Sequence, residues 1–187
     1  MEPKELAEDH PLYTHRTTDA KAKLISILTS KTVYASPMPA LPGNPEAVCL
    51  TECVWDALVR HAVAYSRYGV VFTKRLIYDK GGGPSLYLRG DTLKAEIANL
   101  PAVLHPLVAP LDPDGALNGV TYDWLHEREW RLPTSLEFDY ADVEYVIVDS
   151  IEDAKEVGGH VGGQFIPEHK YIPMAVYETI REAWRES

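Results

Sequence analysis

Cysteine is scarce in this chain, because only Cys49 and Cys53 occur among its 187 residues. Two thiols cannot build the disulfide framework of a small secreted domain, and a zinc site normally takes four ligands. No second Cys or His pair lies at a suitable spacing. We therefore expect two buried free thiols and no bound metal. A chain of this length buries roughly 70% of its unfolded surface and can fold on its hydrophobic core alone.

Long apolar runs are also missing. No run approaches the roughly 18 residues that a membrane-spanning helix needs. Residues 1–9 are charged and lack the apolar centre of a signal peptide. The composition, 45% hydrophobic and 25% charged, is that of an ordinary globular protein. These observations predict a cytoplasmic protein with no membrane partner.

Positive charge is in deficit. The chain carries 18 Lys and Arg against 28 Asp and Glu, which gives a net charge of -10. Such a surface repels phosphate backbones at long range. We expect no broad, nonspecific nucleic-acid binding, although one local basic cleft is compatible with this charge.

The common catalytic and nucleotide-binding motifs are absent as well. The glycines at 81–83 and at 158–163 match neither a P-loop nor a dinucleotide-binding fingerprint, so both are predicted to be turns. The chain has no Gly-x-Ser-x-Gly, His-Glu-x-x-His or zinc-deaminase motif. A carboxylate-bound metal hydrolase or nuclease is the weakest hypothesis, since no Asp, Glu and His cluster has convincing spacing.

What is present is a series of short elements. Strands are predicted at 12–16, 32–35, 47–50, 68–72, 85–88 and 143–148, and helices at 20–30, 51–65, 92–104, 151–157 and 175–184. Thr17 or Thr18 is expected to cap the first helix, Pro101 to interrupt the third, and the prolines 106, 110 and 113 to mark irregular chain. Strands and helices do not alternate strictly, which disfavours a doubly wound parallel sheet. We predict one α+β domain spanning 1–187, with a mixed or mainly antiparallel sheet of short strands, three to four flanking helices and a flexible lead-in at 1–11.

The most unusual stretch is His-Glu-Arg-Glu-Trp-Arg at 126–131. On a strand, Trp130 and Leu132 share one face, which we expect to lie on the core, and Glu127, Glu129 and Arg131 share the other. Same-side neighbours lie about 6.5–7 Å apart, so one carboxylate can contact a sugar while the other handles a proton. The same pattern also fits a solvated strand with cross-strand ion pairs.

Two further segments are candidates for binding. His15 and Arg16 stand at the end of the first predicted strand, where such a pair can hold a phosphate or a ribose hydroxyl, although an ordinary exposed basic pair fits equally. Thr51 is expected to be the N-cap of the second helix, with Glu52 complementing the helix dipole.

Several of these blocks together resemble the bacterial abortive-infection AbiGi-type proteins. The resemblance covers roughly residues 12–149, and its most specific parts are Glu-Arg-Glu-Trp-Arg at 127–131 and Tyr-Gly-Val-Val-Phe at 68–72. It also includes His-Arg-Thr-Thr at 15–18, Val-Cys-Leu-Thr-Glu at 48–52 and Gly-Gly-Gly-Pro-Ser-Leu-Tyr-Leu at 81–88. This family is named for its phage-resistance context, so the resemblance implies a role in phage defence.

A looser similarity is to DarT-type ADP-ribosyltransferases, in which an N-terminal His precedes a helix and a late Glu is catalytic. The similarity implies that NAD is the substrate, bound without a Rossmann motif. By this similarity Glu129 is catalytic and Glu127 assists the acceptor. His15, Arg16, Thr51 and Arg131 then belong to the NAD site, and Tyr68 or Tyr87 stacks on nicotinamide. The chain departs from the pattern at the middle Ser-Thr-Ser type motif, for which Thr51 is the stand-in.

Two functions therefore stay open. The first is a phage-defence domain with NAD-dependent mono-ADP-ribosyltransferase-like chemistry acting on a macromolecular acceptor. The second is a non-enzymatic antitoxin or partner of a two-gene abortive-infection system, which the net charge of -10 favours because an acidic protein can neutralise a basic toxin.

Overall fold

The chain divides into two compact units, each assembled from separate stretches of sequence. The computed structural model describes residues 11–39, 41, 43–52, 66–111, 116–117, 120–121, 128–162 and 166–185, and at 11–19, 116–117, 120–121 and 181–185 it describes the backbone alone. Unit 1 comprises residues 1–31, 54–73 and 138–187, and unit 2 comprises residues 32–53 and 74–137. The single domain expected from the sequence stays a prediction.

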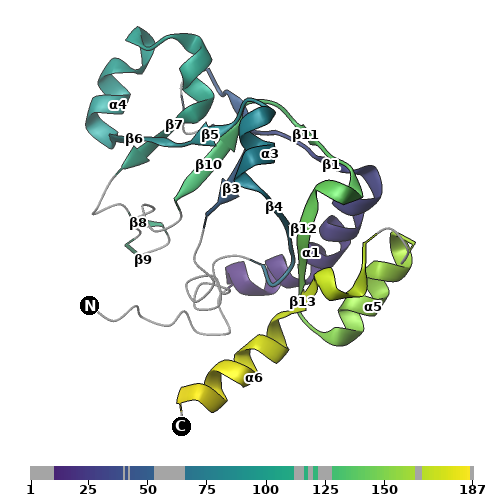
Figure 1. Ribbon diagram of the computed structural model, residues 1–187. Coiled ribbons are helices and arrows are strands. Elements are labelled where there is room, and N and C mark those ends of the chain that lie inside the picture. Colours follow the sequence, from purple (N-terminus) through teal and green to yellow (C-terminus); the bar gives the residue numbers. More distant parts are fainter. Residues whose placement is uncertain are drawn as a thin grey trace. The chain divides into compact units, whose positions relative to one another are not determined.

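Unit 1 contains a three-stranded mixed sheet in the order β13–β12–β4 (Figure 1). Its strands are β4 (Gly69–Phe72), β12 (Val143–Val148) and β13 (Tyr171–Pro173). The central strand β12 runs antiparallel to β4 and parallel to β13. Its apolar run is buried at Val143, Val146, Ile147 and Val148, as a strand packed on both faces requires. The predicted strands at 68–72 and 143–148 are confirmed.

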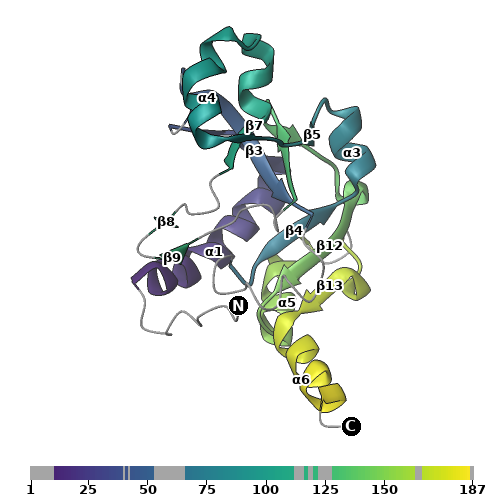
Figure 2. The same cartoon turned by 90° about the vertical axis from the view of Figure 1, so that its left-hand side faces the viewer.

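Helix α1 (Pro11–Ser30) lies alongside the β4–β12 pair (Figure 2) and buries Leu24 and Leu28. The strand predicted at 12–16 and the cap predicted at Thr17 or Thr18 are wrong, because residues 11–30 are helical throughout. The strand preference of residues such as Tyr13 and Thr14 depends strongly on context and is overridden here. The predicted end at residue 30 is confirmed.

Two more helices and two 3-10 turns lie in the described part of unit 1. They are α5 (Ile151–His160), α6 (Met174–Arg185), η4 (Tyr140–Asp142) and η5 (Glu168–Lys170). Ser150 caps α5 by accepting a hydrogen bond from the Asp153 N–H at 3.1 Å. Helix α5 continues through Gly158 and Gly159, which were predicted to begin a loop. Glycine has a low helix propensity, which is why the sequence predicted a loop there. A Cβ at residue 158 would lie 3.6 Å from the Tyr171 hydroxyl, so Tyr171 lies close to this part of α5.

Unit 2 is built on a four-stranded antiparallel sheet in the order β2–β3–β10–β5. The strands are β2 (Ser36–Pro37), β3 (Glu46–Thr51), β10 (Glu129–Leu132) and β5 (Gly83–Pro84). Three two-stranded ladders accompany it: antiparallel β1 (Thr32–Val33) with β11 (Leu136–Glu137), parallel β6 (Leu86–Arg89) with β7 (Val108–Leu111), and antiparallel β8 (Ala116–Leu117) with β9 (Val120–Thr121).

Short helices cover part of unit 2. They are α3 (Lys74–Asp79), α4 (Gly90–Glu96), η1 (Ile97–Asn99) and η2 (Ala102–Leu107), and Pro101 interrupts the series as predicted. Leu41, Leu93, Ile97 and Val108 form a buried cluster beneath them. Pro110 was predicted to lie in irregular chain but is part of β7, an edge position where a residue without an N–H is tolerated.

The expected α+β class is confirmed by these helices and short, mostly antiparallel ladders. Among the described helices, none combines the length and the apolar character needed to cross a membrane.

Candidate functional site

Glu129 and Arg131 form an ion pair on strand β10. The Arg131 Nε donates to Glu129 Oε1 at 2.9 Å, and Nη2 donates to Oε2 at 3.0 Å. Arg131 Nη1 donates to the Val108 carbonyl at the start of β7. The side chains are only 15% and 9% exposed, respectively, so the pair is largely removed from water. A bidentate pair in this setting fixes the orientation of both groups.

The prediction for this strand holds in part. Glu129 and Arg131 share one face and Leu132 is buried on the other, but Arg131 is buried as well, so the protein covers both faces of β10 at that point. The reason is the contact with the Val108 carbonyl, which the alternation of side chains could not reveal. Trp130 is partly buried. Glu127 lies outside the described residues.

Neighbouring strands place more polar groups on the face that carries Glu129. Thr51 and Cys49 of β3 are the register partners of Glu129 and Arg131, and directly opposed residues point to the same face. On the other side, the Ser85 N–H donates to the Glu129 carbonyl at 2.8 Å. The Tyr87 hydroxyl accepts from the Glu129 N–H at 3.0 Å. We call Cys49, Thr51, Ser85, Tyr87, Glu129 and Arg131 the polar cluster.

Within the polar cluster, Ser85 has an unsatisfied hydroxyl. Its Oγ is buried and has no hydrogen-bond partner within the described chain. Buried polar atoms are nearly always paired, with protein, water or a ligand. The Ser85 hydroxyl is therefore the one atom of the polar cluster that is buried without a partner within the described chain.

The surroundings of Cys49 favour the protonated thiol. The residue reaches the surface, which corrects the expected burial, yet surrounding atoms desolvate the thiol. This desolvation, together with a hydrogen bond to Glu129, raises the pKa of the Cys49 thiol to about 12. The thiolate is the reactive form of cysteine, so at neutral pH Cys49 acts as a hydrogen-bond donor to the carboxylate. Cys53 lies outside the described residues.

On the opposite face of β10, Trp130 belongs to a separate group of hydrogen-bonded side chains. The indole Nε1 donates to Glu52 Oε2 at 2.9 Å, and Lys74 Nζ donates to Glu52 Oε1 at 2.9 Å. These two hydrogen bonds, that from Lys74 first, lower the pKa of Glu52. Arg128, which precedes β10, has a positive φ of 47°. Glu52 thus binds Trp130 and Lys74, and its expected role at the dipole of the second helix stays a prediction because residues 53–65 are not described.

The remaining predicted site residues belong to unit 1. His15 and Arg16 lie inside α1 and not at a strand end, and their side chains are not described. The structure thus brings Glu129, Arg131, Thr51 and Tyr87 together in unit 2, and the convergence of His15 and Arg16 with Glu129 stays a prediction. Residues 53–65, including the body of the predicted second helix, are not described, so the cap assigned to Thr51 also stays a prediction. Thr51 itself ends β3.

Tyr68 is anchored by the N-terminal turn of α5. Its hydroxyl donates to Asp153 Oδ2 at 2.9 Å, and Lys21 Nζ donates to Asp153 Oδ1 at 3.0 Å. Burial, then the hydrogen bond to Asp153, raises the pKa of Tyr68 to about 12. Lys21 also binds Glu156 at 2.7 Å, which ties α1 to α5. Sequence reasoning missed Asp153, because its partners are distant in the chain.

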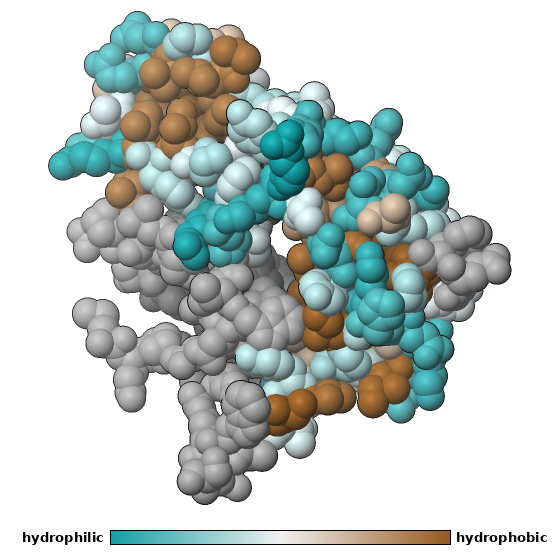
Figure 3. Space-filling model, in the orientation of Figure 1, coloured by the Kyte–Doolittle hydropathy of each residue, from teal (hydrophilic) through white to brown (hydrophobic). Residues whose placement is uncertain are grey.

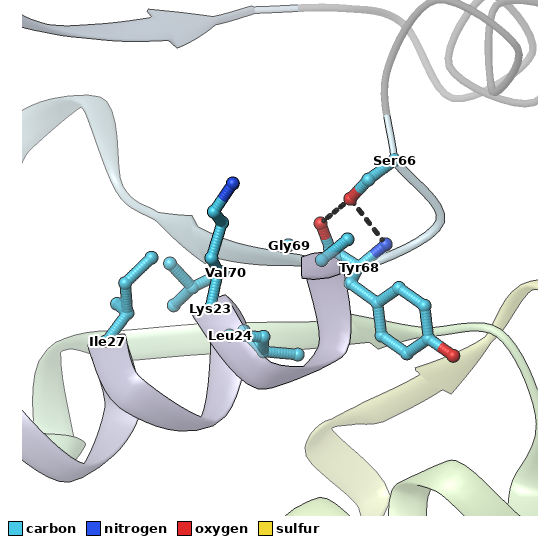
Figure 4. A pocket seen from close by; sticks show the side chains of 8 residues that line it. Lys23, Leu24, Ile27, Ser66, Tyr68, Gly69 and Val70 are labelled. Carbon is cyan, nitrogen blue, oxygen red and sulfur yellow. Dashed lines mark hydrogen bonds between the residues drawn. The ribbon is translucent and has the colours of Figure 1, made fainter. Parts of the chain in front are cut away.

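A pocket of about 230 Å³ opens beside Tyr68, between α1 and β4 (Figure 4). It is lined by Ala20, Lys23, Leu24, Ile27, Ser66, Tyr68, Gly69 and Val70. Arg16 precedes Ala20 by four residues, about one helical turn. Tyr68 and α1, both chosen from the sequence, therefore meet at one pocket of unit 1.

No group of three or more His, Cys, Asp or Glu side chains suited to a metal ion occurs in the described part of the chain. A scan against protein-family models, a search of curated proteins and a search of solved structures each found no match to this sequence.

Proposed function

We propose that this chain is a cytoplasmic phage-defence domain with NAD-dependent mono-ADP-ribosyltransferase-like chemistry, in which Glu129 is the catalytic carboxylate. The observation that carries the proposal is the polar cluster. Four residues selected from the sequence, Glu129, Arg131, Thr51 and Tyr87, come from three neighbouring strands. Arg131 binds the Glu129 carboxylate, Thr51 is the register partner of Glu129, and the Tyr87 hydroxyl accepts from the Glu129 backbone N–H.

The proposed step is cleavage of the bond between nicotinamide and C1′ of its ribose. Nicotinamide leaves with the bonding electrons, the ribose acquires positive charge, and a nucleophile of the acceptor then bonds to C1′ and loses its proton. A fixed carboxylate beside the ribose stabilises that charge as it develops, as it does in glycoside hydrolysis. Glu129 takes this role because its carboxylate is already oriented before substrate binds.

Arg131 positions the catalytic carboxylate. An ionised carboxylate has about four lone-pair sites, and the bidentate contact uses one on each oxygen. The Cys49 thiol uses a third site, and in this proposal the remaining site meets a ribose hydroxyl or the charged C1′ region. The Tyr87 hydroxyl holds the Glu129 backbone in place and, by the resemblance, its ring stacks on nicotinamide.

The roles of the other residues rest on the resemblance alone. In this proposal His15 and Arg16 bind the NAD phosphates, Tyr68 is the alternative stacking residue, and Glu127 assists the acceptor. Thr51 supplies the hydroxyl of the missing middle motif, and its register position opposite Glu129 supports this assignment.

Calorimetry with NAD tests the proposal. Wild-type protein should bind NAD, and Glu129→Gln should bind it with altered enthalpy while a matched exposed variant, Glu137→Gln of β11, behaves as wild type. Thermal melts confirm that each variant is folded. Absence of binding to wild-type protein at millimolar NAD would contradict the proposal.

A second function, a non-enzymatic partner protein, is favoured by exposed apolar surface. Apolar atoms gather over the α4 end of unit 2 (Figure 3), and Val103 of the adjoining η2 is 75% exposed. Val176 and Ile180, one turn apart on α6, are 40% and 48% exposed. Monomeric proteins rarely leave large apolar patches uncovered.

Co-purification with the product of the neighbouring gene separates the two functions. If the chain is a partner protein, Val103→Asp or Ile180→Asp should abolish the complex and Glu129→Gln should not. If both aspartate variants retain the complex, these apolar surfaces are not the interface.

A further inference from the structure

The pocket between α1 and β4 has the dimensions of a small-molecule site. Its volume of about 230 Å³ corresponds to about eight water molecules at roughly 30 Å³ each. Apolar cavities of roughly 150 Å³ already accept a molecule as large as benzene. A chain of about six to eight carbon atoms therefore fits this space.

The wall of the pocket is apolar. Ala20, Leu24 and Ile27 line it from one face of α1. Figure 4 shows Leu24 and Ile27 on α1 and Val70 on β4. Water gains few hydrogen bonds against such a wall, so an apolar occupant is favoured. Ser66 adds little polarity, because its hydroxyl donates to the Tyr68 carbonyl at 2.7 Å and accepts from the Tyr68 N–H at 3.1 Å.

The lining of the pocket includes a cationic side chain. Lys23 is the one charged side chain among the eight that line it, and Figure 4 shows it extending from α1 beside Val70. Asp153, which receives the Tyr68 hydroxyl, is already compensated by Lys21. An ammonium group has three donors, so Lys23 can bind a ligand anion in addition to its other contacts.

From these observations we infer that the pocket between α1 and β4 binds a small amphipathic carboxylate. Its hydrocarbon part lies against Ala20, Leu24, Ile27 and Val70, and its carboxylate meets Lys23. This site lies wholly within unit 1 and does not depend on the chemistry proposed for Glu129. A carboxylate is preferred over a neutral lipid because of Lys23, and a short chain is preferred over a long one because of the volume.

Titration of the full chain with octanoate, followed by calorimetry and by amide NMR shifts, tests the inference. Octanoate should bind and perturb the amides of α1 and β4, and 1-octanol should bind about fivefold more weakly, as should octanoate to Lys23→Gln. The matched control is Lys94→Gln, an exposed lysine on α4 of unit 2, which should bind octanoate like wild type.

Ala20→Leu provides a second test, because it adds bulk to the pocket wall without changing charge. If the circular dichroism of Ala20→Leu is that of wild type, the variant should lose octanoate binding. If Ala20→Leu is unfolded, the affinity of Lys23→Gln for octanoate tests the inference instead. Failure of wild-type protein to bind octanoate, equal affinity for octanol, or unchanged affinity in Lys23→Gln would each overturn the inference. NAD binding is measured separately, so either proposal can fail without the other.

Discussion

Removing the Glu129 carboxylate should destabilise the protein strongly. Glu129→Ala takes away both oxygens that the Arg131 guanidinium binds and leaves it with the Val108 carbonyl as its partner among the described contacts. Breaking a buried pair by deleting one member typically costs about 3–5 kcal/mol, because the other charge stays buried without compensation. The 15% and 9% exposure of the two side chains places this pair near the buried limit.

Unfolding in urea and by heat measures the loss. At about 2–4 °C per kcal/mol for a chain of this size, the melting temperature should fall by roughly 10 °C. The double variant Glu129→Leu/Arg131→Met should lose less than Glu129→Ala, because an apolar pair leaves no charge buried. Asp91→Ala, which breaks the exposed pair with Arg89, is the control and should change little. The claim that the pair is buried and stabilising would be refuted by either of two results. One is a loss of unfolding free energy below about 1 kcal/mol for Glu129→Ala, and the other is a double variant that is less stable than Glu129→Ala.

Three further predictions follow from individual contacts. Cys49 should react slowly with iodoacetamide at neutral pH, because the pKa of its thiol is raised to about 12. The reaction should be faster in Glu129→Gln, because that change removes the charged partner that helps to raise the pKa. Rapid labelling of the wild-type protein would contradict this prediction. The Tyr68 phenol, with its pKa raised to about 12, should titrate late in ultraviolet absorbance, and the stability that it contributes should be present below pH 10 and be lost as pH rises toward 12; Tyr68→Phe should remove this dependence. Gly82→Ala should cost about 1–3 kcal/mol in urea unfolding. A Cβ at residue 82 would come 2.6 Å from Ile77 Cγ2 and 3.0 Å from the Arg131 carbonyl, whereas at Gly83 it would meet nothing within 4 Å, so equal losses for Gly82→Ala and Gly83→Ala would contradict the prediction.

Elements with a strong local pattern could be predicted from the sequence. The apolar run at 143–148, the strand at 68–72 and the terminal helix each follow from periodicity within a few residues. The helical state of residues 12–16 could not, because Tyr13 and Thr14 favour strands locally and such preferences are readily overridden. The extension of α5 through two glycines could not be predicted either, because glycine has a low helix propensity.

The candidate site shows the same division. Alternation on β10 correctly placed Glu129 and Arg131 on one face. The burial of Arg131 depends on the Val108 carbonyl, and the parts played by Ser85 and Tyr87 depend on strand pairing, which joins residues more than 40 positions apart. No local pattern contains such information, so these contacts became visible only in the folded chain.

Release of nicotinamide tests the central claim most directly. Wild-type protein incubated with NAD and a cell lysate as the source of acceptor should release nicotinamide, detected by chromatography, and should transfer labelled ADP-ribose to a macromolecule. Folded Glu129→Gln should bind NAD and release none, while Glu137→Gln should match wild type. Equal release by Glu129→Gln and wild type, or none by wild type, would contradict the assignment of Glu129 as the catalytic carboxylate.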